Sequence, residues 1–297
     1  MVDIGRPPED SWQRALKERE KSLRNCYETL KSYESAKIQL LNPTYFVPGW
    51  TAESASTWSE EFTSSEEYYK PLKYWIGRII ANPEYAKIVQ LNNESAESLS
   101  FIELGRRLKE TLVSKGSLEK ISLVGHSMGG LDIRAAVLDD DHPLLKVQDF
   151  ITLGTPNRGA FSAGFFNFNT FVEWFNKRVR DLTSQQVEQA KSMSIGSPDI
   201  RAINETKSWI TLSERIESFF IFMGLKDMAV QNTPKVDKES IPKDIFETKF
   251  RIFQTAGTEH TGRHGITQDP RILLPVLKVL SGQKLKDDLN HGYIVRK

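Results

Sequence analysis

Cysteine is almost absent from this sequence, since Cys26 is the one thiol among 297 residues. A lone cysteine cannot form an intramolecular disulfide, and it cannot by itself supply a zinc site or a dithiol redox pair. We therefore expect no disulfide and no zinc or redox chemistry of cysteine, and the chemistry that the motifs below predict requires no metal or cofactor either.

The sequence also lacks an excess of one charge and any long apolar run. It has 40 Lys and Arg against 39 Asp and Glu, a formal net charge of +1, which gives no reason to expect nucleic acid or an anionic membrane as the main partner. No apolar run is long enough to cross a bilayer, and the first ten residues lack the apolar core of a signal peptide. These absences predict a soluble, cytoplasmic protein.

Strand-like and helix-like patterns alternate through most of the chain. A hydrophobic content of 39% is sufficient for a core in a chain of this size. Short apolar runs predict strands at residues 44–47, 86–91, 121–124, 150–153, 219–223 and 250–254. Helical patterns fall at residues 74–81, 101–112, 129–138 and 270–280. Strands that alternate with helices predict an α/β fold with a mostly parallel central sheet flanked by helices.

Residues 9–39 carry a helical pattern rich in Lys, Arg and Glu. Apolar residues recur there at intervals of three, four and seven: Trp12, Leu16, Leu23, Tyr27 and Leu30. We interpret this segment as a surface helix docked on the main body; the alternative is a dimerising coiled coil, which few heptads support. The predicted organisation is an N-terminal helical extension at residues 1–40 and one α/β domain at residues 41–297.

The segment 121–130, I-S-L-V-G-H-S-M-G-G, joins the third predicted strand to a helix. It contains the G-x-S-x-G nucleophile elbow in the strand–turn–helix context that this motif requires. The two glycines let strand and helix approach closely, so the Ser127 hydroxyl is expected at the tip of a sharp turn. Because a serine hydroxyl is a weak nucleophile unaided, Ser127 needs a base and an acid that orients the base.

The base must be one of five histidines. His126 neighbours the serine on the elbow, where we expect its side chain to leave the turn in another direction. His142 follows an acidic run, and His291 lies in a predicted tail. His260 and His264 fall in the loop between the last predicted strand and the closing helix. Functional groups of an open α/β sheet collect beyond the carboxyl ends of its strands, so either of these two could meet the elbow.

The acid is expected at the end of the strand at residues 219–223. Asp227 lies just past this strand, where it would accept a hydrogen bond from the imidazole, fix its tautomer and stabilise the imidazolium. The alternatives Asp237, Glu239 and Asp244 lie further on, in a Lys-rich segment expected to be solvated. The chain order serine, aspartate, histidine is the order of the α/β-hydrolases.

Two backbone N–H groups would have to face the developing oxyanion. One is expected from Met128, directly after the nucleophile, and the other from Trp50, in the loop after the strand at residues 44–47. Gly49 would let that loop turn tightly toward the substrate. The alternative is that Pro48 and Gly49 form an ordinary turn.

Together these segments resemble the lipase branch of the α/β-hydrolase superfamily, over residues 44–281. The matching motifs are V-G-H-S-M-G-G-L-D at residues 124–132, L-G-T-P-N-R-G at 153–159, G-S-P-D-I at 196–200 and H-G-I-T-Q-D-P-R at 264–271. The last is similar to the H-[SG]-I-x-x-D-P-R segment that carries the family's catalytic histidine, so the resemblance favours His264 over His260. It implies the α/β-hydrolase fold and a catalytic triad of Ser127, Asp227 and His264.

The sequence departs from the family pattern at three places. Pro48 stands where the family commonly has a histidine before glycine, and Asp227 is followed by Met-Ala-Val rather than by a glycine-containing continuation. The first strands of a full α/β-hydrolase are also hard to find before Thr44. The oxyanion loop and the acid are therefore where this chain differs from the family motif, and the missing strands indicate a shortened N-terminal region replaced by the helix.

We predict that the chain hydrolyses carboxylic esters, small-molecule or lipid, through an acyl-enzyme. Residues 160–215 would form an aromatic-rich helical cap, with Phe161, Phe165 and Phe166 lining an acyl-binding cleft and making transient contact with lipid surfaces. The alternative is that these rings bind no substrate and pack against the α/β domain, since a high density of aromatic residues usually marks a core. Thioesters or amides are alternative substrates for the same residues, and a non-catalytic binding protein is the alternative of a different class. The oligomeric state stays open.

Overall fold

A computed structural model of the chain provides its three-dimensional structure. It describes residues 9–49, 57–58, 68–89, 99–114, 120–141, 143–160, 184–224, 227, 240–255, 257–260, 264–285 and 293–296.

The centre of the molecule is a seven-stranded sheet in the order β2-β1-β3-β4-β5-β6-β7. The strands are β1 (Thr44–Val47), β2 (Ala86–Ile88), β3 (Ile121–His126), β4 (Val147–Leu153), β5 (Ile216–Gly224), β6 (Phe250–Thr255) and β7 (Tyr293–Arg296). The first six run parallel, and β7 joins the edge antiparallel to β6. The predicted α/β fold with a mostly parallel sheet is therefore confirmed, whereas the sequence patterns gave no sign of β7.

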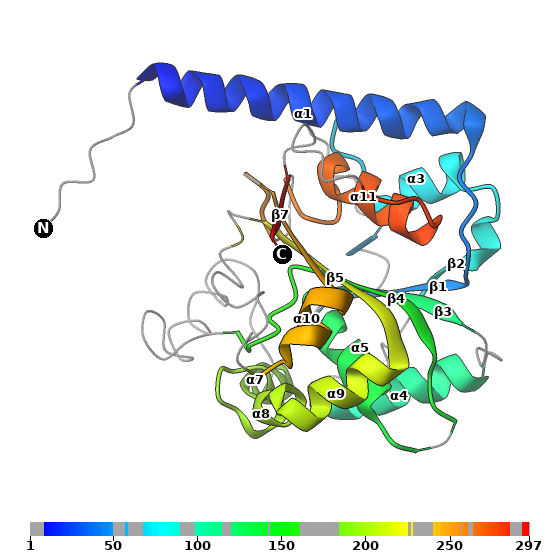
Figure 1. Cartoon of the computed structure of the whole chain (residues 1–297), viewed down its shortest axis with the longest axis vertical. Coiled ribbons are helices and arrows are strands. Elements are labelled where there is room, and N and C mark those ends of the chain that lie inside the picture. The colour runs from blue at the N-terminus through cyan, green and yellow to red at the C-terminus, as the bar shows by residue number, and fades with distance from the viewer. Residues whose placement is uncertain are drawn as a thin grey trace, which may run out of the picture.

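Helices cover both faces of this sheet (Figure 1). One face carries α1 (Glu9–Ala36), α3 (Leu72–Ile79) and α11 (Pro270–Leu280). The other carries α4 (Phe101–Ser114), α5 (Met128–Leu138), α7 (Ser184–Ser192), α8 (Pro198–Asn204), α9 (Thr206–Arg215) and α10 (Lys243–Lys249). A short 3₁₀ helix, η1 (Pro83–Tyr85), precedes β2. In the part of the chain that the structure describes, no helix combines the length and the apolarity needed to cross a membrane.

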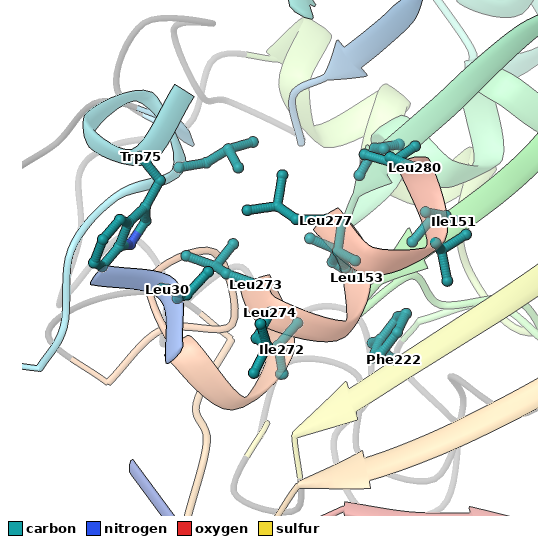
Figure 2. Close-up of a cluster of buried hydrophobic side chains, with 14 of the residues drawn as sticks. Leu30, Trp75, Ile151, Leu153, Phe222, Ile272, Leu273, Leu274, Leu277 and Leu280 are labelled. Atoms are coloured by element: carbon teal, nitrogen blue, oxygen red, sulfur yellow. The ribbon is translucent and has the colours of Figure 1, made fainter. Parts of the chain in front are cut away.

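Helix α11 forms the centre of the first hydrophobic layer. Its leucines Leu273, Leu277 and Leu280 are buried in one cluster with Ile151 and Leu153 of β4, and Leu273 lies on the side of Leu30 and Trp75 (Figure 2). The helix starts at Pro270, where the missing N–H costs nothing, and the Asp269 carboxylate accepts the Arg271 N–H at 2.9 Å as an N-cap.

The N-terminal helix packs on this layer and is not set apart from it. Cys26, Tyr27 and Leu30 of α1 are buried in the cluster that contains α11 and α3, and the Tyr27 and Trp75 rings meet edge to face with centroids 5.5 Å apart. The apolar side of the helix is thus used within its own chain, as the surface-helix interpretation predicts. Within residues 9–43 the structure contains no strand before β1.

A group of aromatic rings packs together within the hydrophobic layer on the opposite face. The rings of Phe150 and Phe219 stack with centroids 4.4 Å apart, and Trp209 of α9 meets Phe250 edge to face at 5.7 Å. Trp209 is 1% exposed. Helix α9, at the end of the segment predicted to be a cap, therefore contributes to the core of the main body.

Candidate active site

Ser127 occupies a backbone conformation that few residues other than glycine adopt. It follows β3 directly, precedes α5, and has φ 52° and ψ −126°. Its N–H donates to the Leu153 carbonyl at 2.9 Å, and its carbonyl accepts the Gly130 N–H at 3.2 Å. Such strain costs of order 1–3 kcal/mol and persists where the surroundings enforce it, which is typical of functional sites. The predicted elbow is present.

The glycines around Ser127 are required by close backbone approach. A Cβ on Gly125 would lie 2.5 Å from the Gly130 nitrogen, and one on Gly129 would lie 2.6 Å from the Val47 carbonyl oxygen. Any side chain at either position would separate β3, α5 and the end of β1. The motif's glycines thus allow the serine to stand above the carboxyl edge of the sheet.

A continuous hydrogen-bond chain leads from Ser127 to a buried carboxylate. The Ser127 Oγ lies 2.9 Å from Nε2 of His260, and Nδ1 of His260 lies 2.8 Å from Oδ2 of Asp227. Ser127, Asp227 and His260 follow the carboxyl ends of β3, β5 and β6, which brings them to one edge of the sheet. Asp227 is 2% exposed and the His260 side chain 15%, so the ring is largely buried and is held on both nitrogens.

The imidazole at the serine belongs to His260, and the expectation that His264 would occupy this position is corrected. The His264 ring instead lies against Tyr69 with centroids 5.0 Å apart, and its Nδ1 is 3.9 Å from a Glu259 carboxylate oxygen. The Glu259 N–H donates to the His264 carbonyl at 3.0 Å, and the Ile266 N–H to the Glu259 carbonyl at 2.9 Å. These bonds fold the chain back on itself, so the two histidines have different surroundings.

The D-P-R part of the same segment has a supporting role that the sequence patterns did not reveal. The Arg271 guanidinium pairs with the Asp269 carboxylate through contacts of 2.6 and 3.0 Å, and the Thr258 hydroxyl donates to the same carboxylate at 2.6 Å. Thr258, Asp269 and Arg271 are all buried. Because Thr258 precedes His260 by two residues, this network anchors the histidine loop to the start of α11.

Gly154 of the L-G-T-P segment lies beside the acid and the base. Its φ is +59°, and a Cβ there would lie 2.9 Å from Oδ2 of Asp227 and 3.1 Å from Nδ1 of His260. The end of β4 therefore leaves just enough space for the Asp227–His260 bond. This close approach accounts for the glycine of the L-G-T-P motif.

His126 is buried next to the base, with 4% exposure. Its ring lies 4.9 Å from that of His260, and its Nε2 is 3.2 Å from the His260 carbonyl oxygen. Burial, and secondarily the neighbouring His260, lower the pKa of His126 to about 3. His126 therefore stays neutral at ordinary pH. Its ring bonds the His260 carbonyl, while the Ser127 hydroxyl bonds His260, in keeping with the expectation that His126 is not the base.

The predicted oxyanion donors are only partly within the described residues. Met128 is the first residue of α5, and a Cβ on Gly49 would lie 2.8 Å from the Ser127 Cβ. The backbone after β1 thus passes directly beside the nucleophile. The candidate residues that lie outside the described residues are Trp50, His142, Phe161, Phe165, Phe166, Asp237, Glu239 and His291. Among the residues that are described, no cluster of three His, Cys, Asp or Glu side chains could hold a metal ion.

Comparisons with known proteins agree with this architecture. Residues 106–250 match the family described as "PGAP1-like alpha/beta domain". No curated protein matches the chain. Among solved structures, lipase B of Aspergillus fumigatus is 14% identical with a TM-score of 0.52, covering 87% of this chain and 57% of that one.

Two further similar structures are a lipase and a phospholipase. Lipase BlEst2 of Bacillus licheniformis, in its propeptide form, is 18% identical with a TM-score of 0.47, covering 85% of this chain and 52% of that one. Phospholipase PlaB of Legionella pneumophila is 13% identical with a TM-score of 0.49, covering 82% and 60%. The chain thus spans between 52% and 60% of the length of these three proteins. At 14% identity, the likeness to lipase B concerns the fold alone.

Proposed function

We propose that this chain is a serine hydrolase of the lipase and esterase branch of the α/β-hydrolase superfamily and that it acts on carboxylic esters through an acyl-enzyme; the family match and the fold support this. Ser127 is the nucleophile, His260 the general base and then the general acid, and Asp227 the group that orients and stabilises the imidazolium. The observation that carries the proposal is the Ser127–His260–Asp227 hydrogen-bond chain, at 2.9 and 2.8 Å, on a strained elbow.

The geometry supports a stepwise acyl transfer. His260 Nε2 accepts the Ser127 proton as Oγ forms a bond to the ester carbonyl carbon, and Asp227 accepts the Nδ1–H of the resulting imidazolium. Collapse of the tetrahedral intermediate breaks the ester C–O bond, and the imidazolium gives its proton to the leaving alcohol. A water then attacks the acyl-enzyme with His260 again as base, which releases the carboxylic acid and restores Ser127.

The oxyanion of each tetrahedral intermediate would be held by the backbone N–H groups of Met128 and Trp50. Met128 begins α5, so the positive end of the helix dipole also favours negative charge there. Removing one donor of this kind typically costs about 2.7–4 kcal/mol of transition-state stabilisation. Trp50 follows Gly49, whose backbone lies against the nucleophile.

For the substrate we propose small-molecule or lipid esters whose acyl chain contacts Phe161, Phe165 and Phe166. The support is the density of aromatic residues in this stretch of sequence. The proposal predicts faster turnover of p-nitrophenyl esters with medium or longer acyl chains than of the acetate. Equal turnover from acetate to long-chain esters would contradict it.

The triad is tested with a matched pair of histidine variants. In Ser127→Ala and His260→Ala, ester turnover and labelling by a serine-directed fluorophosphonate should fall by more than about 1,000-fold, because triad members act as a unit. His264→Ala should retain labelling, since its ring contacts Tyr69 and not the serine. Undiminished turnover in Ser127→Ala would contradict the proposed function. Loss of turnover and labelling in His264→Ala but not in His260→Ala would identify His264 as the base, as the family resemblance implies. Thioester and amide substrates, assayed with the same variants, decide which acyl bond is preferred.

A further inference from the structure

Two neighbouring elbow residues bind the same histidine. Ser127 Oγ lies 2.9 Å from the His260 ring, and His126 Nε2 lies 3.2 Å from the His260 main-chain carbonyl oxygen. One contact therefore concerns the side chain of the base and the other its backbone. Both come from consecutive residues at the end of β3, so the positions of nucleophile and base are linked by a very short path.

The His126 ring is itself held in place by the core. It is buried next to Trp58, with ring centroids 6.3 Å apart and planes at 75°, and Trp58 in turn meets Phe46 of β1 edge to face at 5.5 Å. Trp58 and Phe46 are fully buried. A donor fixed in this way can hold a loop carbonyl at one place, because packed side chains have few alternative rotamers.

The chemistry of this contact defines the proton position on His126. A carbonyl oxygen only accepts hydrogen bonds, so Nε2 must carry the hydrogen and Nδ1 the lone pair of a neutral ring. Burial favours this neutral form. A neutral ring also matters for catalysis, because a second positive charge 4.9 Å from the His260 ring would oppose formation of the imidazolium.

We propose that His126 is a positioning residue: its Nε2–H holds the His260 carbonyl and thereby places the His260 ring between Ser127 and Asp227. This inference rests on the proposed function of the triad. The Asp227 and Ser127 bonds orient the ring about its own axis, whereas the carbonyl bond fixes the backbone from which the ring projects. A base displaced by a fraction of an ångström lengthens the bond through which the serine proton must pass.

The test uses three substitutions that separate the donor from the bulk of the ring. Glutamine carries its amide N–H close to the place of Nε2, asparagine carries it close to the place of Nδ1, and leucine has no donor. We expect His126→Leu and His126→Asn to slow fluorophosphonate labelling and to lower kcat for an ester by about 10- to 100-fold, the range for leaving one buried group unpaired. KM should change by less than about twofold, and His126→Gln should restore most of the rate.

The possible results distinguish a positioning role of His126 from an effect of ring packing and from failure of the proposed function. Folding is checked for each variant by circular dichroism and thermal unfolding, and if His126→Leu does not fold, the Asn and Gln variants carry the comparison. Labelling of His126→Leu or His126→Asn at the wild-type rate overturns the inference, and so does a His126→Gln variant as slow as His126→Asn, which would assign the effect to ring packing. Failure of the proposed function is recognised separately, because the wild-type protein itself would then resist labelling or Ser127→Ala would be labelled equally fast.

Discussion

At the scale of single residues, the site depends on positions without a side chain as well as on the residues that react. Gly154 contributes no side chain, yet a Cβ in its place would come 2.9 Å from the Asp227 carboxylate. Gly196 has a similar backbone, with φ +79° against +59°, but a Cβ there would meet nothing within 4 Å. Alanine variants of the two glycines therefore distinguish the effect of backbone strain from the effect of crowding Asp227 and His260.

We expect Gly154→Ala and Gly196→Ala both to lose about 1 kcal/mol or more of unfolding free energy, because alanine is strained at positive φ. Only Gly154→Ala should also lose esterase activity per folded molecule, by about tenfold or more, as the added methyl group displaces Asp227 or His260. Urea unfolding and steady-state kinetics on both variants check this. Equal activity in the two variants would mean that the space beside the Asp227–His260 bond is not limiting.

The two histidines of the loop after β6 illustrate what a sequence can and cannot resolve at this scale. The position of His260 and His264 beyond a strand end predicted correctly that one of them meets Ser127, because parallel strands bring their carboxyl ends to one edge. The family segment then pointed to His264. The choice depends on the backbone bonds between Glu259, His264 and Ile266, which fold the loop back and leave no periodic signal in the sequence.

At the scale of secondary structure, elements with a strong local signal were predictable. The apolar runs of β1, β3, β4, β5 and β6 and the helix after the elbow were found because burial on both faces requires continuous apolar residues. Helix α10 and the edge strand β7 were not found, and helices α8 and α9 were covered only by the general expectation of a helical cap at residues 160–215. They are short or polar on one side, and they form where tertiary packing, such as Trp209 against Phe250, overrides a weak local preference.

The junction between the histidine loop and α11 depends on one buried ion pair, which gives a prediction for this element. Arg271→Met should lower the unfolding free energy by about 3–5 kcal/mol, since it leaves the Asp269 carboxylate buried without its cation. Activity per folded molecule should fall as well, because Thr258 and His260 lose their anchor. Chemical unfolding and fluorophosphonate labelling measure the two effects.

A control for this prediction is the exposed pair between Lys243 and Glu247, 3.8 Å apart on α10. Lys243→Ala should change stability by no more than about 0.5 kcal/mol, because solvent screens such pairs. A comparably small effect of Arg271→Met would show that the buried network does not support the loop.

At the scale of the whole molecule, the N-terminal helix is part of the same hydrophobic layer as α3 and α11. Leu30 is fully buried in that layer, together with Trp75 and Leu273. The sequence predicted a docked helix from the spacing of its apolar residues, but it could not name the surface that receives it, since that surface is assembled from segments about 40 and 240 residues further along the chain. A helix so placed should unfold together with the sheet.

We therefore expect Leu30→Ala to lower the unfolding free energy of the entire protein by about 2–5 kcal/mol, the usual cost of a cavity in a well-packed core. Lys31→Ala, at the exposed neighbouring position, should change it by less than about 0.5 kcal/mol. Tryptophan fluorescence and far-ultraviolet circular dichroism should report a single shared transition in both variants. An independent early transition of the helix would contradict this, and so would a transition midpoint that rises with protein concentration, because a coiled-coil dimer, unlike a helix docked within its own chain, is stabilised by mass action.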